Sequence, residues 1–162
     1  MKSALVALAC LVPLAASATE PSYLSVVGEI VGKVEAHRIL RDYCAKARPE
    51  SAASNAAAYD SWSARNAELL KRVDVQRAHA DKFLAKRAAS DPDPMAPKSA
   101  AEVVAAMEQV FWAQLDKLEQ PLQQNVCVRF GDSLAATEQK WQAEIGGLLD
   151  RASTIEKSLV EP

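Results

Sequence analysis

The chain has 162 residues, of which 25% are charged, and its 19 basic side chains are nearly balanced by 21 acidic ones. This balance excludes the clustered basic excess that binds nucleic acid and the basic amphipathic face that binds anionic lipid. The length indicates a single domain that is large enough to bury a hydrophobic core.

The first eighteen residues predict a cleaved secretory signal peptide. Lys2 precedes an apolar run from Ala4 to Ala16, and the small residues that a signal peptidase needs follow in Ala16-Ser17-Ala18. We therefore expect cleavage before Thr19. The domain then comprises residues 19–162, with 18 basic against 21 acidic side chains, because Lys2 is the one charge lost.

Two other interpretations of the leader have less support. An uncleaved anchor is disfavoured because the apolar run is too short to span a bilayer of ~30 Å, and no later apolar stretch is long enough to form a second span. A lipoprotein signal ending at Cys10 is disfavoured because few apolar residues precede that cysteine. A periplasmic or secreted protein is the expectation.

Two cysteines, Cys44 and Cys127, remain after cleavage. In an oxidising compartment an even number of cysteines is usually paired, and two cysteines allow one connectivity. Closing a loop of about 84 residues would stabilise the fold by roughly 4–5 kcal/mol in the chain-entropy model. A metal pair or redox couple is the alternative, but Cys-x-x-Cys is absent and the two thiols are far apart in the sequence.

The composition is that of an all-α protein, rich in strong helix formers and poor in glycine. A first helix is expected from Ser22 to about Ala47, ending before Pro49. Gly28 and Gly32 lie four residues apart on it, which suggests close contact with another helix.

A second and longest helix is expected from about Ser51 or Ser54 to Ala89. Its apolar seam includes Tyr59, Trp62 and Asn66, spaced almost as in a heptad repeat. A buried amide must find hydrogen-bond partners, so we predict that Asn66 fixes the pairing of helices, with Arg65 at the edge of the seam.

After the proline-rich residues 90–98, Ser99 and Glu102 form a capping box that begins a third helix. Pro121 should kink or end that helix. Gly131 should then break the chain, and Asp132 or Ser133 should cap a fourth helix that runs to about Ser158.

These four segments predict an antiparallel four-helix bundle. The first and third helices of such a bundle end at the same pole. A bridge between Cys44 and Cys127 would join the end of the first helix to the junction before the fourth, so the topology and the predicted disulfide agree.

No catalytic residue, metal site or cofactor is predicted, because hydrolase, phosphate-binding and dinucleotide motifs are all missing. His37 and His79 are expected to face solvent. Each has a carboxylate two residues away, Glu35 or Asp81, but residues two apart on a helix point to different faces. Haem has little support: Cys-x-x-Cys-His is absent, and non-covalent ligation would rest on His79 and Met107 alone.

The segment W-x-x-R-N, formed by Trp62, Arg65 and Asn66 and placed between Cys44 and Cys127, resembles a pattern in small exported helical proteins of proteobacteria. The resemblance implies a location in the cell envelope and does not imply any particular activity.

The leading hypothesis is a non-enzymatic protein that acts through protein–protein or cell-envelope interaction. Trp112 lies off the main seam and is the candidate partner contact, beside an exposed apolar patch or groove. The alternative is a small-ligand or cofactor carrier with a cavity lined by Trp62, Met107 and Trp141. An enzyme is the third and weakest hypothesis. The polar residues around Pro121 are expected to form a solvated helix bend rather than a binding loop; they are Glu119, Gln120, Gln123, Gln124 and Asn125.

Overall fold

A computed structural model describes residues 22–90 and 97–160. The signal peptide expected at residues 1–18 lies outside this part of the chain. All regular structure in the described residues is helical, which confirms the all-α prediction. The elements are α1 (Tyr23–Ala47), the 3-10 turn η1 (Pro49–Ser51), α2 (Ala52–Arg65), α3 (Ala67–Ser90), α4 (Ala100–Leu115), α5 (Gln120–Val128) and α6 (Phe130–Val160).

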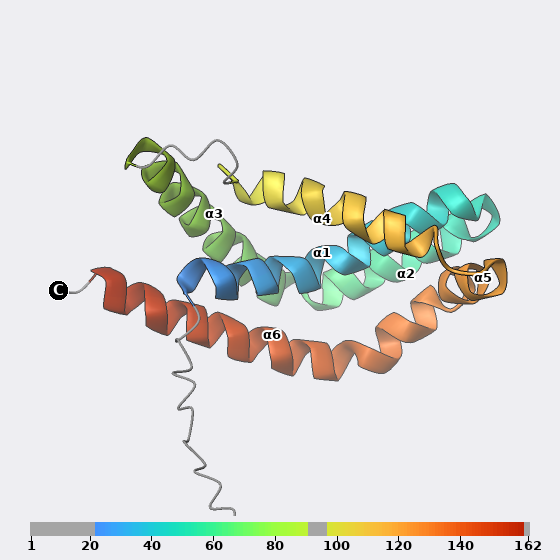
Figure 1. The fold of residues 1–162 in the computed structure, drawn as a ribbon. Helices are drawn as coiled ribbons and strands as arrows, with labels where there is room; N and C mark the ends of the chain where they lie inside the picture. Colours follow the sequence, from blue (N-terminus) through green and yellow to red (C-terminus); the bar gives the residue numbers. More distant parts are fainter. Residues whose placement is uncertain (1–21, 91–96, 161–162) are drawn as a thin grey trace, which may run out of the picture.

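The helices run alternately up and down, as the bundle prediction requires. Figure 1 shows α2 and α3 returning along α1, α4 running back beside α1, and α6 returning once more, with α5 as a short corner. The chain therefore makes four antiparallel passes, and the predicted antiparallel bundle is confirmed. None of the helices in the described residues is both long and apolar enough to cross a bilayer.

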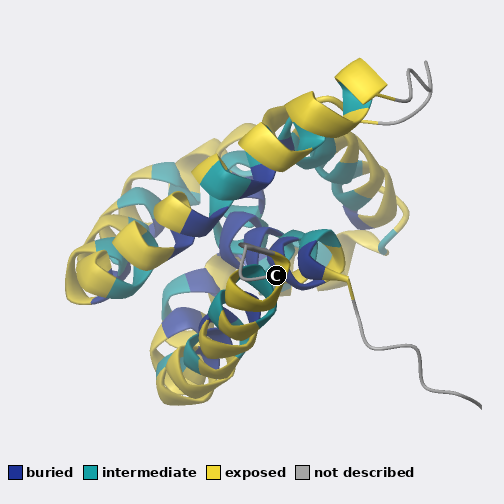
Figure 2. Ribbon diagram, turned by 90° about the vertical axis from the view of Figure 1, so that its left-hand side faces the viewer, coloured by how far each residue is buried: buried dark blue, intermediate teal, exposed yellow. Residues whose placement is uncertain are grey.

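Helix α1 is the central helix, and it packs against α2, α3, α4 and α6. Its buried residues occur on several sides, for example Val27, Ile39 and Cys44, because neighbours surround it. The start and end agree with the sequence: the Ser22 side chain accepts a hydrogen bond from the Ser25 N–H at 3.2 Å, and the helix stops just before Pro49. Figure 2 shows the buried residues gathered between the helices.

The second predicted helix is wrong in one respect, because it is two helices that meet at Asn66. Helix α2 ends at Arg65 and α3 begins at Ala67. The Asn66 side chain donates a hydrogen bond to the Trp62 carbonyl at 2.8 Å. An asparagine that bonds to nearby backbone competes with helical geometry, which explains a bend where helix formers lie on both sides.

The predicted chain break at Gly131 is also wrong. Helix α6 begins at Phe130 and includes Gly131, so neither Asp132 nor Ser133 acts as its N-cap. A Cβ atom on Gly131 would lie 3.1 Å from the Cβ of Ala58, so this glycine allows α6 to approach α2 closely. Pro121 lies in the first turn of α5, where its missing N–H leaves no hydrogen bond unmade.

The predicted cap of the third helix is present in a modified form. The Ser99 hydroxyl accepts from the Glu102 N–H at 3.2 Å, but the Glu102 carboxylate accepts from the Lys98 N–H rather than from that of Ser99. A carboxylate of α3 also takes part: Asp81 accepts from the Ala100 N–H at 2.6 Å. The start of α4 is therefore attached to α3.

The predicted disulfide is confirmed. Cys44 at the end of α1 is bonded to Cys127 in α5, with their Cα atoms 5.3 Å apart. Both are fully buried in a small second core with Tyr43 and Leu115. The bridge therefore links the first helix to the segment between the third and fourth passes of the bundle.

Candidate functional site

An apolar groove lies between three helices, with a volume of about 210 Å³. We call it the α1–α3–α4 groove. Its lining residues are Leu24, Val27, Gly28 and Val31 of α1, Ala80, Leu84, Arg87 and Ala88 of α3, and Pro97, Ala100 and Val103 from the start of α4 and the residues before it.

The groove exists because several of its lining residues have small side chains or none, and these do not fill the space between the three helices. A Cβ atom built on Gly28 would meet no atom within 4 Å, so the space above this glycine is open. Gly32, one turn further along α1, is different: its Cβ would lie 3.1 Å from the Met107 methyl. The two glycines therefore differ in role, since Gly32 serves close packing and Gly28 leaves room in the groove.

The size of the groove suits a small apolar group. An engineered apolar cavity of about 150 Å³ stays dry and binds benzene. The α1–α3–α4 groove is somewhat larger than that and is open on one side, so a ligand could enter without unfolding the domain. Among the described residues that line it, Arg87, an exposed residue near the end of α3, is the one with a charged side chain.

A partly buried network of ion pairs joins α1, α3 and α4 further along α1 from the groove. Glu35 of α1 is 8% exposed and accepts from Arg38 Nε and from Arg77 Nη2 of α3, both at 2.6 Å. Arg38 also donates to Glu108 of α4 at 3.1 Å. The network therefore joins α1, α3 and α4.

The charges in this network stay ionised at neutral pH. Burial acts to raise the pKa of the Glu35 carboxyl, but the hydrogen bonds from Arg38 and Arg77 outweigh it, and the pKa lies below its usual value. The hydrogen bond to Glu35 is the main reason that the pKa of Arg38 is raised. A general acid or base needs a pKa near the working pH, so this network suits a structural role.

Asn66 lies in a second polar cluster, where the bend between α2 and α3 meets α6. Its side chain is buried and makes three hydrogen bonds, which use both of its N–H groups and its oxygen. The amide nitrogen donates to the Trp62 carbonyl at 2.8 Å and to Glu138 at 2.9 Å, and the amide oxygen accepts from Gln142 at 2.8 Å. Arg65, half-exposed at the edge, donates to Glu138 at 2.8 Å and lowers the pKa of that carboxyl.

His37 does not face solvent as predicted. Its ring packs edge-on against Trp62, with the centroids 4.8 Å apart, and lies 5.9 Å from the ring of Trp141. Burial lowers the pKa of His37. The helical periodicity of the sequence could not reveal this, because neighbours on several sides of α1 partly cover residues that lie between its apolar positions.

His79 is half-exposed, and its Nδ1 lies 2.5 Å from a carboxylate oxygen of Glu156. It is therefore paired with α6 and not with Asp81. Within the described residues, no group of three or more histidine, cysteine, aspartate or glutamate side chains is placed to hold a metal ion.

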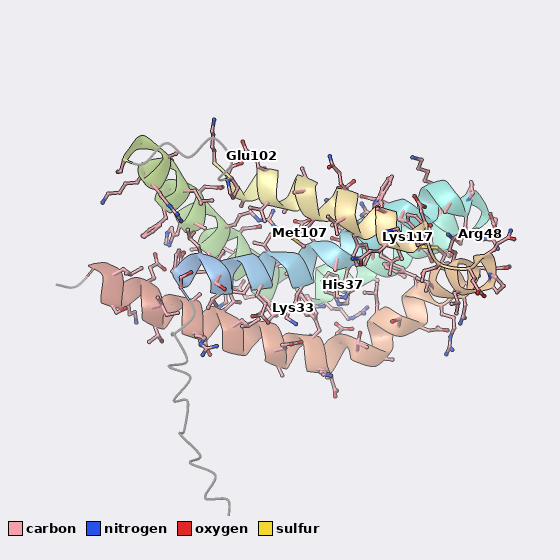
Figure 3. The ribbon with its side chains drawn as sticks, viewed as in Figure 1. Lys33, His37, Arg48, Glu102, Met107 and Lys117 are labelled. Atoms are coloured by element: carbon pink, nitrogen blue, oxygen red, sulfur yellow. A yellow bond between two sulfur atoms is a disulfide. The ribbon has the colours of Figure 1, made fainter. Side chains whose placement is uncertain are left out.

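The cavity predicted between Trp62, Met107 and Trp141 is not formed. The rings of the two tryptophans pack edge-on at 4.7 Å. Met107 lies on a different side of α1, against Gly32. Figure 3 shows Met107 between α4 and α1, whereas His37 lies on the side of α1 that faces α6. The three residues predicted to share one space are therefore separated by α1.

Trp112 is partly exposed, unlike Trp62 and Trp141, which are buried. The edge of its ring meets Tyr43, with centroids 6.0 Å apart, and the Lys46 ammonium group lies 5.0 Å from its centroid.

Of the polar residues around Pro121, Gln123 has a structural role, since its amide donates to the Leu115 carbonyl at the end of α4. Sequence reasoning missed the groove itself, although the spacing of Leu24, Gly28 and Val31 on α1 places them on one face.

No protein-family model, curated protein or solved structure matches this chain.

Proposed function

We propose that the protein acts by binding and not by catalysis, and that the α1–α3–α4 groove takes the apolar part of a small ligand. The observation that carries this proposal is the open space above Gly28, enclosed by aliphatic side chains of three helices. Filling such a space with an apolar group removes hydrophobic surface from water at about 25 cal/mol per Å².

The surroundings of the ionisable groups favour binding over catalysis. The buried carboxylate of Glu35 is held by two guanidinium groups, and the ring of His37 lies among tryptophans. Neither group has a partner that would make it a nucleophile or a proton relay. A non-enzymatic carrier is therefore the function that we favour.

We further propose that the carrier is exported to the periplasm or secreted. The leader-like residues 1–18 support this location, and so does the Cys44–Cys127 disulfide, because such bonds persist in oxidising compartments.

Interaction with a partner protein or with another component of the cell envelope is the second candidate function. Phe83 favours it, because this large apolar residue is 43% exposed. Its ring packs on that of Tyr23, with centroids 6.1 Å apart, and both residues directly precede lining residues of the groove. A partner could cover Phe83 while it inserts an apolar side chain into the groove.

The test is binding of the neutral fluorescent probe N-phenyl-1-naphthylamine to residues 19–162. Gly28→Leu fills the open space and should weaken binding at least about tenfold, since more than 1.4 kcal/mol of burial is lost. Gly147→Leu is the matched control, because Gly147 lies on exposed α6 surface and its Cβ would also meet no atom within 4 Å. Equal binding by the two variants would remove the groove as the site.

Native mass spectrometry of the protein purified from the exporting cell separates the two candidate functions. A carrier should retain an added mass of a few hundred daltons, whereas a partner-binding protein should retain a second chain. In the second case Phe83→Ala should release the partner, and probe binding should be unaffected.

A further inference from the structure

We infer that the groove binds a single-chain ligand with one negatively charged head group, such as a medium-chain carboxylate, and that Arg87 holds the head group. This inference rests on the proposed function, because it names the class of ligand for the same groove. It depends on the position of Arg87 relative to the apolar part of the groove.

Contacts between helices define the two ends of the groove. Tyr23 at the start of α1 packs on Phe83 of α3, with ring centroids 6.1 Å apart, whereas Glu35, three turns later in α1, pairs with Arg77, which lies earlier in α3. The start of α1 therefore lies beside the later part of α3. Arg87 lies about two turns beyond Ala80 along α3 and therefore at the outer end of the groove, whereas Val31, further along α1, lies toward the inner end.

The described residues of the inner part have aliphatic or small side chains, and Arg87 lies at the outer end. From Ala80 to Arg87 the wall formed by α3 is about 10 Å long, at ~1.5 Å per residue. A ligand that matches this arrangement has an apolar tail of about that length and a charged head. A guanidinium group prefers a carboxylate because its planar fork can donate two parallel hydrogen bonds.

Among the described residues, two acidic groups near this region, Asp81 and Glu102, are engaged with the backbone at the start of α4. Asp81 accepts from the Ala100 N–H at 2.6 Å, and Glu102 accepts from the Lys98 N–H at 2.8 Å. Both carboxylates are thus held at the start of α4, and neither lines the groove. The charge presented by the lining residues is positive, which complements an anion.

The experiment compares displacement of N-phenyl-1-naphthylamine by decanoate and by 1-decanol, which share one chain length and differ in the head group. Decanoate should displace the probe from the wild-type protein at an about tenfold lower concentration, as one charge-assisted hydrogen bond at a partly exposed site predicts. Arg87→Gln should abolish this preference and leave displacement by decanol unchanged. Lys86→Gln, an exposed neighbour that does not line the groove, is the matched control and should keep the preference.

The outcomes separate the two proposals. Equal displacement by decanoate and decanol from the wild-type protein would overturn the inference about the head group, while binding of the probe would still support the groove. A preference for decanoate that survives Arg87→Gln would overturn the role of Arg87. Absence of probe binding by the wild-type protein would overturn the proposed function itself.

Discussion

Removing the Asn66 side chain should destabilise the domain by about 2–3 kcal/mol. Asn66→Ala deletes two hydrogen bonds to neutral groups, which are worth about 1 kcal/mol each, and one to the Glu138 carboxylate, which is worth about 1.5–3 kcal/mol. The full sum is an upper limit, because Glu138 keeps its bond from Arg65 and exposed Gln142 can turn to water.

A second substitution tests whether the hydrogen-bond pattern matters and not only the volume. Asn66→Asp keeps the shape of the side chain but replaces the donor that faces Glu138 at 2.9 Å with a carboxylate oxygen. Two facing carboxylates raise each other's pKa, so the folded state then binds a proton more readily than the unfolded state. The stability of this variant relative to wild type should therefore rise as the pH falls from 7.5 to 5.

The assay is urea unfolding, followed by circular dichroism and tryptophan fluorescence at both pH values. Asn125→Ala, a substitution of an exposed asparagine on α5, is the control and should change stability by less than about 0.5 kcal/mol. If Asn66→Ala falls within the same range, or if Asn66→Asp shows the pH dependence of the wild type, the proposed role of Asn66 in joining α2 and α3 to α6 is refuted.

Three further predictions concern the rest of the bundle. Replacing both Cys44 and Cys127 by alanine should lower the free energy of unfolding by roughly 4–5 kcal/mol, and a loss under about 1 kcal/mol would contradict the chain-entropy estimate. Burial lowers the pKa of His37, so the unfolded state takes up its proton first below about pH 6.5. Wild type should thus lose more stability than His37→Gln between pH 7.5 and 5.5 in urea titrations, and parallel curves would disprove this. Gly28→Ala should stabilise the protein by about 0.5–1 kcal/mol, because the added Cβ meets no atom within 4 Å. Gly32→Leu should destabilise it by about 1–3 kcal/mol, because the larger side chain would overpack against Met107. If thermal unfolding ranks the two variants the other way, the two glycines do not differ in role as described.

Features that depend on neighbouring residues could be predicted from the sequence. The limits of α1 follow from the Ser22 cap and from Pro49, and the start of α4 follows from Ser99. The pairing of Cys44 with Cys127 followed from parity and from the order of the helices. Local propensity decides the helix limits, and the disulfide follows because the two cysteines allow one pairing and the helix order brings them to the same end of the bundle.

The break at Asn66 was the first feature that the sequence could not decide. Helix formers on both sides predict a continuous helix, and the partners that hold the asparagine in place, Glu138 and Gln142, are more than 70 residues away. Gly131 shows the opposite case, since a typical helix breaker lies inside α6 because α2 packs closely against it.

The sequence by itself determined the helical class, the limits of α1, the start of α4 and the disulfide, since these follow from local hydrogen bonding and from a single possible pairing. Only the tertiary structure decided that His37 packs against Trp62, that Tyr43 and Lys46 lie against Trp112, and that an open groove lies above Gly28. The physical reason is that burial and empty space depend on how several helices meet, and the same apolar stripe can pack tightly, as at Gly32, or leave room one turn away.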